Sequence, residues 1–292
     1  EYRPRPGVIE DTLRGRFTPM NARADTPEVL IQDVALDDVT LSVRVAGDGP
    51  LVLCVHGFPD DARSFRGQVP ALVARGFRVV CPTLRGYRPS GVARSGRYDA
   101  EAIGRDLRDL ADRFSPTEPV RLVGHDWGAI ATYAATAMAP ARFSHLVTLA
   151  VPHPRNILRR LGPSQLRRSW YIGLFQLPRV AEARLAESDF ALIDRLWRDW
   201  SPSYRAARED LDAIKAGIAP RVGEVLAYYR SLTSLRSIAG APRRLLFAKT
   251  EVPALYLHGE EDGCLGFELV EGVEAHYRAG VRVHRVRGAG HF

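Results

Sequence analysis

Short apolar runs alternate with helical segments through the first half of the chain, and this constrains the fold most. The runs PLVLCVHG, FRVVCPT, PVRLVG and SHLVTLAV are short and rich in β-branched residues, which predicts buried strands. DAEAIGRDLRDLADRF and AIATYAATAMAP lie between them and have helical spacing. A further helical stretch is predicted over about 62–75, and two strands with a turn at LDD over 28–45. Strands alternating with helices predict an α/β fold, with a mostly parallel sheet covered on both faces.

The alternation stops after Val151 and returns at EVPALYLHGEEDG. The segment 153–241 between them has no buried strand run, and it is rich in Arg, Trp and Tyr. We therefore predict a core formed by 28–152 and 242–292, with 153–241 inserted as a helical cap. The cap is expected over the carboxyl ends of the strands, where open α/β sheets bind ligands.

Residues 1–27 are predicted to be an N-terminal extension. MNARADTPEVL, from Met20 onward, is typical of a natural start, so residues 1–19 are interpreted as an upstream addition. The first residues are polar and lack the apolar segment of a secretory signal. No run approaches the roughly 18 apolar residues of a membrane helix, so no membrane partner is expected.

The charge pattern argues against nucleic acid as a partner. The net charge is +7, and only Lys215 and Lys249 are lysines among the 41 basic residues. The arginines alternate with acids, as in GRDLRDLADRF, which is typical of a solvated helix face. Three cysteines without a spacing pattern fit a reducing cytoplasm, where we expect the protein to be located. No metal-binding motif is present, and no metal or cofactor is expected.

The segment RLVGHDWGAIATYA is predicted to form a strand, a tight turn and a helix, with Asp126 at the tip of the turn. Gly124 and Gly128 supply the small flanking residues that a strained turn requires. This is the elbow that exposes a nucleophile beside a helix N-terminus. A helix-capping aspartate is the common alternative for such a turn. The partners of Asp126 therefore decide between the two interpretations.

Those partners follow in the order expected for this fold, which is nucleophile, acid and histidine. His291, in GAGHF after the last predicted strand, stands in the histidine position. The loop after LYLHG offers Glu260, Glu261 and Asp262 as the acid. We choose Asp262, which lies deepest in the loop and precedes a glycine.

A carboxylate nucleophile points to a particular reaction class. Asp126 would attack a saturated carbon that carries a leaving group and form an alkyl ester. His291, oriented by Asp262, would then deprotonate the water that hydrolyses this ester. The backbone N–H groups of Phe58 and Trp127 are expected to stabilise the oxyanion. The substrates predicted are epoxides or compounds with carbon–halogen bonds.

On these residues the chain resembles epoxide hydrolases of the α/β-hydrolase superfamily, from about Glu28 to Phe292. HGFPD resembles the family's His-Gly-x-Pro loop, in which His56, Gly57 and Pro59 support the site and the Phe58–Pro59 bond is cis. GHDWG resembles its nucleophile elbow, and VPHP the start of its cap. One departure is a threonine in PTLRGYRPSG, where the family usually has an aspartate.

Two cap motifs extend the resemblance. SWYIGLFQLPRVAE places Tyr171 seven positions before a proline, and VLAYYRSL places Tyr229 directly before Arg230. The resemblance implies that both phenols donate hydrogen bonds to the epoxide oxygen. Tyrosine suits this task because its pKa near 10 keeps it neutral at pH 7. Aromatic packing in a helical cap is the alternative, and Tyr228 is the substitute if the helix register differs.

Two other functions stay open. A haloalkane or haloacid dehalogenase would use the same nucleophile. The Trp127 side chain fits halide binding, but Phe58 stands where dehalogenases often carry an asparagine. A non-catalytic ligand receptor on the same scaffold is the third hypothesis. The partners expected are a small epoxide and water, and a homodimer stays open.

Overall fold

A single eight-stranded sheet forms the centre of the molecule. The computed structural model describes residues 27–292. The strands are β1 (Leu30–Ala35), β2 (Thr40–Ala46), β3 (Leu51–Val55), β4 (Arg78–Pro82), β5 (Val120–His125), β6 (Phe143–Leu149), β7 (Ala254–Gly259) and β8 (Val281–Val286). Their order is β1-β2-β4-β3-β5-β6-β7-β8. Only β2 pairs antiparallel with its neighbours, β1 and β4. The predicted α/β class with a mostly parallel sheet is confirmed.

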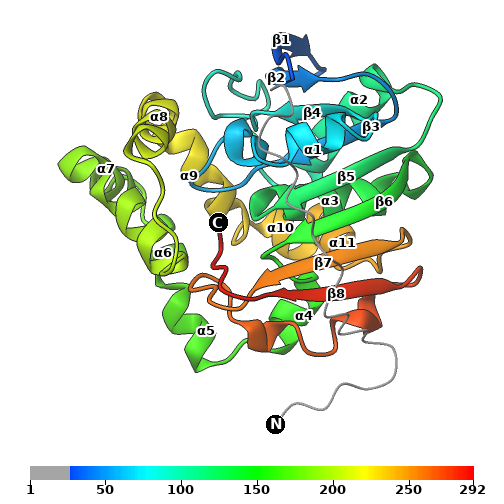
Figure 1. Cartoon of the computed structure of the whole chain (residues 1–292). Helices are drawn as coiled ribbons and strands as arrows, with labels where there is room; N and C mark the ends of the chain where they lie inside the picture. Colours follow the sequence, from blue (N-terminus) through cyan, green and yellow to red (C-terminus); the bar gives the residue numbers. More distant parts are fainter. Residues whose placement is uncertain (1–26) are drawn as a thin grey trace.

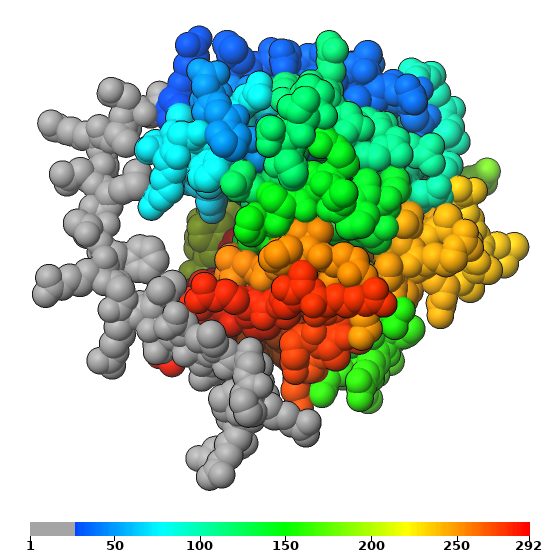
Figure 2. All heavy atoms as spheres, turned by 90° about the vertical axis from the view of Figure 1, so that its right-hand side faces the viewer, coloured from blue at the N-terminus to red at the C-terminus, as the bar shows by residue number. Residues whose placement is uncertain are grey.

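The apolar strand runs are buried because helices cover both faces of the sheet. In β3, Leu51, Leu53 and Val55 face the larger core cluster, while Val52 and Cys54 face a smaller one. The helices of the core are α1 (Val69–Val73), α2 (Ala100–Phe114), α3 (Trp127–Met138) and α11 (Ala241–Leu246). α1 packs on β4, while α2, α3 and α11 pack together on the other face. Figure 2 shows the segments following one another in sheet order, from blue through green and orange to red.

The helical stretch predicted over 62–75 is broken into two short pieces. A 3₁₀ turn covers Ala62–Phe65, and α1 begins only at Val69. Gly67 lies between the two pieces, and Pro70 stands in the first turn of α1. Proline lacks the N–H that a continuous helix would use, and glycine disfavours a helix interior. The local sequence therefore ends one piece and starts the next.

The chain between β6 and β7, all of it described, forms helices and loops without a strand. These helices are α4 (Pro154–Arg159), α5 (Pro163–Arg168), α6 (Trp170–Phe175), α7 (Val180–Trp200), α8 (Arg208–Ile218), α9 (Val222–Ser231), α10 (Leu235–Ala239) and finally α11. In Figure 1, α6 to α9 lie at the left, beyond the strand ends, and the C-terminus lies between them and the sheet. The helices α4 to α10 between β6 and β7 are called the cap helices, and the sheet with its helices is called the core; the predicted division into 28–152 and 242–292 against 153–241 stays a prediction.

Of the predicted extension 1–27, only residue 27 falls inside the described part of the chain. Over residues 27–292, no helix combines the length and the apolar character needed to cross a bilayer.

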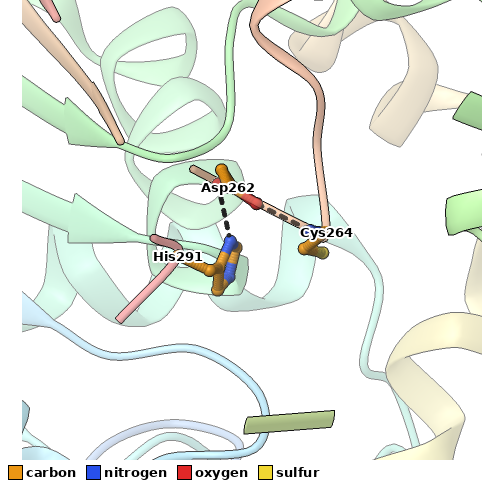
Figure 3. Close-up of side chains that lie close together, drawn as sticks. All are labelled: Asp262, Cys264 and His291. Carbon is orange, nitrogen blue, oxygen red and sulfur yellow. Dashed lines mark hydrogen bonds and ion pairs between the residues drawn. The ribbon is translucent and has the colours of Figure 1, made fainter. Parts of the chain in front are cut away.

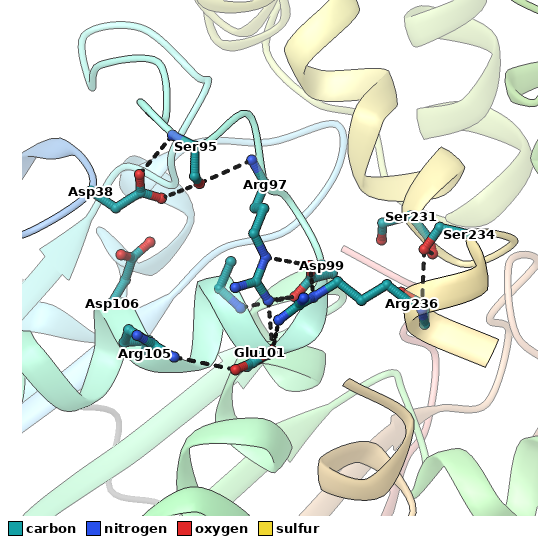
Figure 4. Close-up of polar contacts among 12 residues, drawn as sticks. Asp38, Ser95, Arg97, Asp99, Glu101, Arg105, Asp106, Ser231, Ser234 and Arg236 are labelled. Atoms are coloured by element: carbon teal, nitrogen blue, oxygen red, sulfur yellow. Dashed lines mark hydrogen bonds and ion pairs between the residues drawn. The ribbon is translucent and has the colours of Figure 1, made fainter. Parts of the chain in front are cut away.

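An ion-pair network joins α10 to the beginning of α2 (Figure 4). Arg236 of α10 donates to Glu101 at 2.7 Å, and its Nε lies 3.6 Å from Asp99. Arg97 donates to both of these carboxylates. Asp99 also accepts from the Ala102 N–H and caps α2. The network therefore connects the helical segment to the sheet domain at the surface.

Candidate active site

Asp126 lies at a strained turn between β5 and α3. Its backbone has φ 51° and ψ −118°, a region that residues with a side chain rarely adopt. The turn can form because Gly128 allows α3 to approach β3. A Cβ on Gly128 would lie only 2.0 Å from the Val55 carbonyl oxygen. The predicted elbow is thus present, and it presents a buried carboxylate.

The loop after β3 supplies a donor to that carboxylate. The Phe58 N–H donates to Asp126 Oδ1 at 2.8 Å. Gly57 makes this approach possible, since a Cβ there would lie 2.4 Å from Asp126 Oδ1 and 2.7 Å from Trp127 N. Trp127 is the first residue of α3, so its N–H belongs to the free N–H groups of a helix start. The two predicted oxyanion donors, the N–H groups of Phe58 and Trp127, therefore both lie close to the Asp126 side chain.

His56 and Pro59 hold this loop through contacts with the core and with α7, respectively. His56 Nε2 accepts from the Leu84 N–H at 3.0 Å, and Nδ1 lies 2.9 Å from the Gly57 carbonyl. Both ring nitrogens are thus occupied in a buried histidine. The Phe58–Pro59 bond is cis, as expected. The Pro59 carbonyl accepts from the Trp197 indole of α7 at 2.8 Å, which links the loop to the cap helices.

His291 and Asp262 form the second half of the predicted triad (Figure 3). His291 Nδ1 lies 3.0 Å from Asp262 Oδ2. The other oxygen of Asp262 accepts backbone N–H groups from Cys264 and Leu265. Of the alternative acids, Glu260 pairs with Arg285 and Glu261 is exposed. The structure therefore places Asp262, among the three loop acids, against the histidine.

The two halves of the triad meet across a short distance. His291 Nε2 lies 3.7 Å from Asp126 Oδ2, which is too long for a hydrogen bond. Nε2 is buried and has no hydrogen-bond partner among residues 27–292. A buried nitrogen of this kind normally has a partner. The imidazole is therefore directed at the carboxylate from a separation at which both can act on a third group.

Two contacts that hold His291 were not foreseen. The Trp200 carbonyl, at the end of α7, accepts from the N–H groups of His291 and Gly263 at 3.0 and 3.1 Å. His125 Nε2 lies 2.7 Å from the His291 carbonyl. One cap carbonyl thus ties the acid loop to the histidine loop. Sequence offered a weak signal only for His125, which stands directly before Asp126.

The charges of the triad stabilise one another. Burial opposes ionisation of Asp126, but the His291 imidazole and the Phe58 N–H outweigh it and hold the pKa of Asp126 below its usual range. Burial also disfavours a charged His291, yet Asp262 and Asp126 raise the pKa of His291 to about 10. Near neutral pH, Asp126 is a carboxylate and His291 is an imidazolium.

Tyr171 of α6 and Tyr229 of α9 lie next to each other in the pocket that contains Asp126. Their ring centroids are 5.7 Å apart at an interplanar angle of 85°, and both line the pocket that Asp126 lines. The Tyr229 hydroxyl is close enough to the Trp127 indole to interact electrostatically, but it makes no hydrogen bond of ordinary geometry to a described residue. Burial raises the pKa of both phenols well above the ordinary value. Both are therefore neutral donors.

Tyr228, the substitute for Tyr229, has a different role. Its hydroxyl donates to the Arg85 carbonyl at 2.8 Å. The buried guanidinium of Arg85 pairs with the buried Asp106 and with the partly exposed Asp38. Tyr228 therefore anchors α9 to the core, and its hydroxyl is already engaged.

The pocket shared by these groups has a volume of about 700 Å³ and a mostly apolar lining. Apolar lining residues outside the triad include Ile130, Val151, Ile157, Leu161, Leu166, Trp170, Ile172, Leu232, Ile238 and Leu246. Most of them come from the helices between β6 and β7. Asp126, Tyr171 and Tyr229 belong to the pocket's polar lining, together with Gln165, Ser169, Ser231, Ser237 and Arg243. A pocket of this size with a mostly apolar lining can accommodate a small apolar molecule.

Three groups in Figure 3 could in principle bind a metal ion. Ligand atoms of Asp262, Cys264 and His291 lie within 4.8 Å of one another. A cysteine ligand must be a thiolate, but burial and the nearby carboxylates raise the pKa of Cys264 well above its usual range. Asp262 already accepts three hydrogen bonds. These three side chains are therefore better suited to orienting His291 through Asp262 than to binding a metal ion.

Known proteins with similar sequences belong to the α/β-hydrolase fold. A family model described as the alpha/beta hydrolase fold matches residues 50–292. The AB hydrolase superfamily protein YfhM of Bacillus subtilis is 31% identical over 258 residues, which is 85% of this chain and 87% of that protein. An epoxide hydrolase of Caballeronia sordidicola is 30% identical over 261 residues, covering 79% of this chain and 78% of the other.

Solved structures agree with the sequence relatives. Epoxide hydrolase A from Mycobacterium thermoresistibile superposes with a TM-score of 0.76 at 29% identity, covering 90% of this chain and 92% of that one. The Bacillus megaterium epoxide hydrolase in complex with an inhibitor gives a TM-score of 0.78 at 25% identity, covering 89% and 93%.

Proposed function

Because the chain belongs to the α/β-hydrolase fold family, in which it groups with epoxide hydrolases, we propose that it converts an epoxide to a vicinal diol through an ester on Asp126. One observation carries this proposal above the others. The elbow presents a buried carboxylate in a pocket that it shares with two buried phenols. A carboxylate suits attack on a saturated carbon, and the phenols suit an oxygen that remains on the substrate.

The first step uses the charge that the site maintains on Asp126. Its lowered pKa keeps the nucleophile ionised at neutral pH. Asp126 attacks one epoxide carbon, the carbon–oxygen bond breaks, and an alkyl ester and an alkoxide form. Tyr171 and Tyr229 donate hydrogen bonds to the oxygen as its charge grows. In the wild type the His291 imidazolium ultimately supplies the proton that the alkoxide takes and becomes a neutral imidazole; in a variant without His291, water can supply this proton, so the ester still forms.

Ester formation itself prepares the base for the second step. While Asp126 is ionised, it helps to raise the pKa of His291 to about 10. The ester carries no charge, so this contribution disappears and the imidazole proton becomes easier to release. Asp262 keeps the ring oriented through Nδ1. His291 thus becomes a base only after the nucleophile has reacted.

In the second step, neutral His291 takes a proton from water, and the hydroxide attacks the ester carbonyl carbon of Asp126. The tetrahedral oxyanion lies where the Phe58 N–H already donates to Asp126 Oδ1. Collapse breaks the ester, the departing alkoxide takes the proton of the new Asp126 carboxyl, and the diol leaves. Asp126 is again a carboxylate, His291 is again an imidazolium, and one oxygen from water remains on Asp126.

A carbon–halogen bond is the competing electrophile for the same carboxylate. The Trp127 indole lines the pocket and supports this second candidate. Halide leaves without needing a proton, however, so dehalogenation would give the two phenols no role. The paired tyrosines therefore favour the epoxide.

The test is the intact mass of a His291→Gln variant after incubation with a panel of epoxides and, separately, haloalkanes. Without the base, the ester on Asp126 should accumulate, with a mass gain equal to the whole epoxide and none in an Asp126→Asn control. A gain equal to the alkyl group alone would establish a dehalogenase. Absence of an adduct, together with no diol formation by the wild type, would favour a non-catalytic receptor.

A single turnover in ¹⁸O-water separates the ester route from direct attack of water on the epoxide. With enzyme in excess, the proposed route places the label on Asp126 and leaves the first diol unlabelled. Label in that first diol would contradict the ester mechanism while leaving the net reaction intact.

A further inference from the structure

The Tyr171 hydroxyl lies against a thiol, whereas the Tyr229 hydroxyl lies near the Trp127 indole. Tyr171 Oη lies 3.3 Å from Cys264 Sγ, a hydrogen bond in which either atom can be the donor. Tyr229 Oη makes no hydrogen bond of ordinary geometry within residues 27–292. Both phenols are nearly fully buried, at 3% and 2% exposure. The two groups assigned to the epoxide oxygen therefore begin the reaction in different hydrogen-bonding states.

The Cys264 thiol is held firmly in place by its own backbone. The Cys264 N–H donates to Asp262 Oδ1 at 2.7 Å, and its carbonyl accepts from Gln165 Nε2 at 2.9 Å. The Gln165 carbonyl oxygen of the same side chain accepts from the Gly266 N–H. The loop that carries the acid therefore also holds the backbone of Cys264, which lies beside Asp262 in Figure 3, and Sγ lies 3.3 Å from Tyr171 Oη.

The Cys264 thiol is protonated near neutral pH. Burial, with the Asp262 and Asp126 carboxylates nearby, raises the pKa of Cys264 well above its usual range. A protonated thiol is a weak donor as well as a weak acceptor. When the Tyr171 proton points at a substrate oxygen, the phenol oxygen itself becomes a buried acceptor. A buried acceptor without a donor is costly, and the Cys264 S–H is the donor within reach.

We propose that Cys264 is a positioning residue for Tyr171, and this inference rests on the epoxide hydrolase function proposed above. Its S–H donates to Tyr171 Oη and thereby turns the phenol proton toward the epoxide oxygen. As the epoxide carbon–oxygen bond breaks, negative charge grows on the substrate oxygen and polarises the phenol, and the hydrogen bond from the Cys264 S–H to Tyr171 Oη strengthens. The thiol proton stays on sulfur throughout. Tyr229 lies near the Trp127 indole instead of a thiol.

The experiment measures the two half-reactions separately in Cys264→Val and Cys264→Ser variants. Rapid-quench mass spectrometry follows formation and decay of the Asp126 ester in a single turnover with an epoxide that the wild type converts. We expect Cys264→Val to slow ester formation about five- to tenfold, the size of one neutral hydrogen bond, with ester decay within about twofold of wild type. Cys264→Ser retains a donor, and its ester formation should stay within about threefold of wild type.

A double-mutant cycle excludes a merely structural effect. In a Tyr171→Phe background the thiol has no phenol oxygen to serve, so Cys264→Val should cause no further loss of ester formation. Cys54→Val is the matched control, because it also replaces a buried thiol in the sheet domain but outside the pocket. It should leave both half-reactions unchanged.

Several results would overturn the inference. These are unchanged ester formation in Cys264→Val, an equal loss in the Tyr171→Phe background, a loss confined to ester decay, or a serine variant as slow as the valine one. Failure of the proposed function looks different, since no ester would then form in any variant, the wild type included.

Discussion

The core side and the cap side of the pocket are built by different means. On the core side, the Phe58 N–H donates to Asp126, and the backbone segments that carry them approach so closely that a Cβ on Gly57 would lie 2.7 Å from Trp127 N. On the cap side, Tyr171 and Tyr229 stand on separate helices, and their rings are held by contacts with other rings. Backbone in direct contact leaves no room for adjustment, whereas packed side chains can shift. The position of Asp126 should therefore tolerate change far less than those of Tyr171 and Tyr229.

The largest difference should appear between two glycines. Gly128→Ala places a Cβ 2.0 Å from the Val55 carbonyl oxygen, whereas a Cβ on Gly173 of α6 meets nothing within 4 Å. We expect Gly128→Ala to lose at least about 3 kcal/mol of unfolding free energy. Gly173→Ala should gain up to about 1 kcal/mol, because alanine favours a helix. Urea unfolding measures both, and equal effects would break the comparison.

The next effect is a pH dependence that belongs to the core side. The pKa of His291 is raised from 6.5 to about 10 in the folded protein. The stability contributed by its contacts with Asp262 and Asp126 is therefore fully present below pH 6.5 and is lost as pH rises through about 10. The difference in unfolding free energy between the wild type and His291→Gln should shrink over that range. A difference that stays constant from about pH 6 to about pH 10.5 would contradict this.

The cap phenols should show a smaller effect, limited to activity. We expect Tyr229→Phe and Tyr171→Phe each to lower kcat/KM about 10- to 100-fold, because a donor to the growing charge is lost, with little change in the thermal midpoint. Tyr228→Phe is the control, since that hydroxyl donates to the Arg85 carbonyl. It should cost about 1 kcal/mol of stability and leave kcat/KM within about twofold. A larger loss of kcat/KM in Tyr228→Phe than in Tyr229→Phe would show that Tyr228, not Tyr229, donates to the substrate.

The smallest effect is expected where the two sides join at the surface. Arg236 pairs with Glu101 in the network of Figure 4, and its side chain is 51% exposed. Solvent screens such a pair, so Arg236→Ala should cost at most about 1 kcal/mol. The loss should disappear in high salt. A greater loss that persists in salt would show that α10 depends on this contact more than on its packing.

Much of the fold was predictable because the patterns involved are local. The length and β-branched content of the runs around Leu53 and Leu122 identify strands without any knowledge of the tertiary structure. The same patterns failed over 62–75, where the predicted helical stretch is broken at Gly67 and Pro70. In the site, the glycines that flank Asp126 and the late position of His291 could be read directly. The contact of Cys264 with Tyr171 could not, since those residues are 93 positions apart.

The sequence by itself determined the class of sheet, the elbow that presents Asp126, and the order of nucleophile, acid and histidine along the chain. These features depend on local periodicity and on residues that a strained turn requires. Only the tertiary structure decided that Tyr228 anchors α9 while Tyr229 faces Asp126, and that the Trp200 carbonyl ties together the two loops of the triad. Adjacent residues of a helix point in different directions, and which direction meets the pocket depends on how the cap helices pack against the sheet domain.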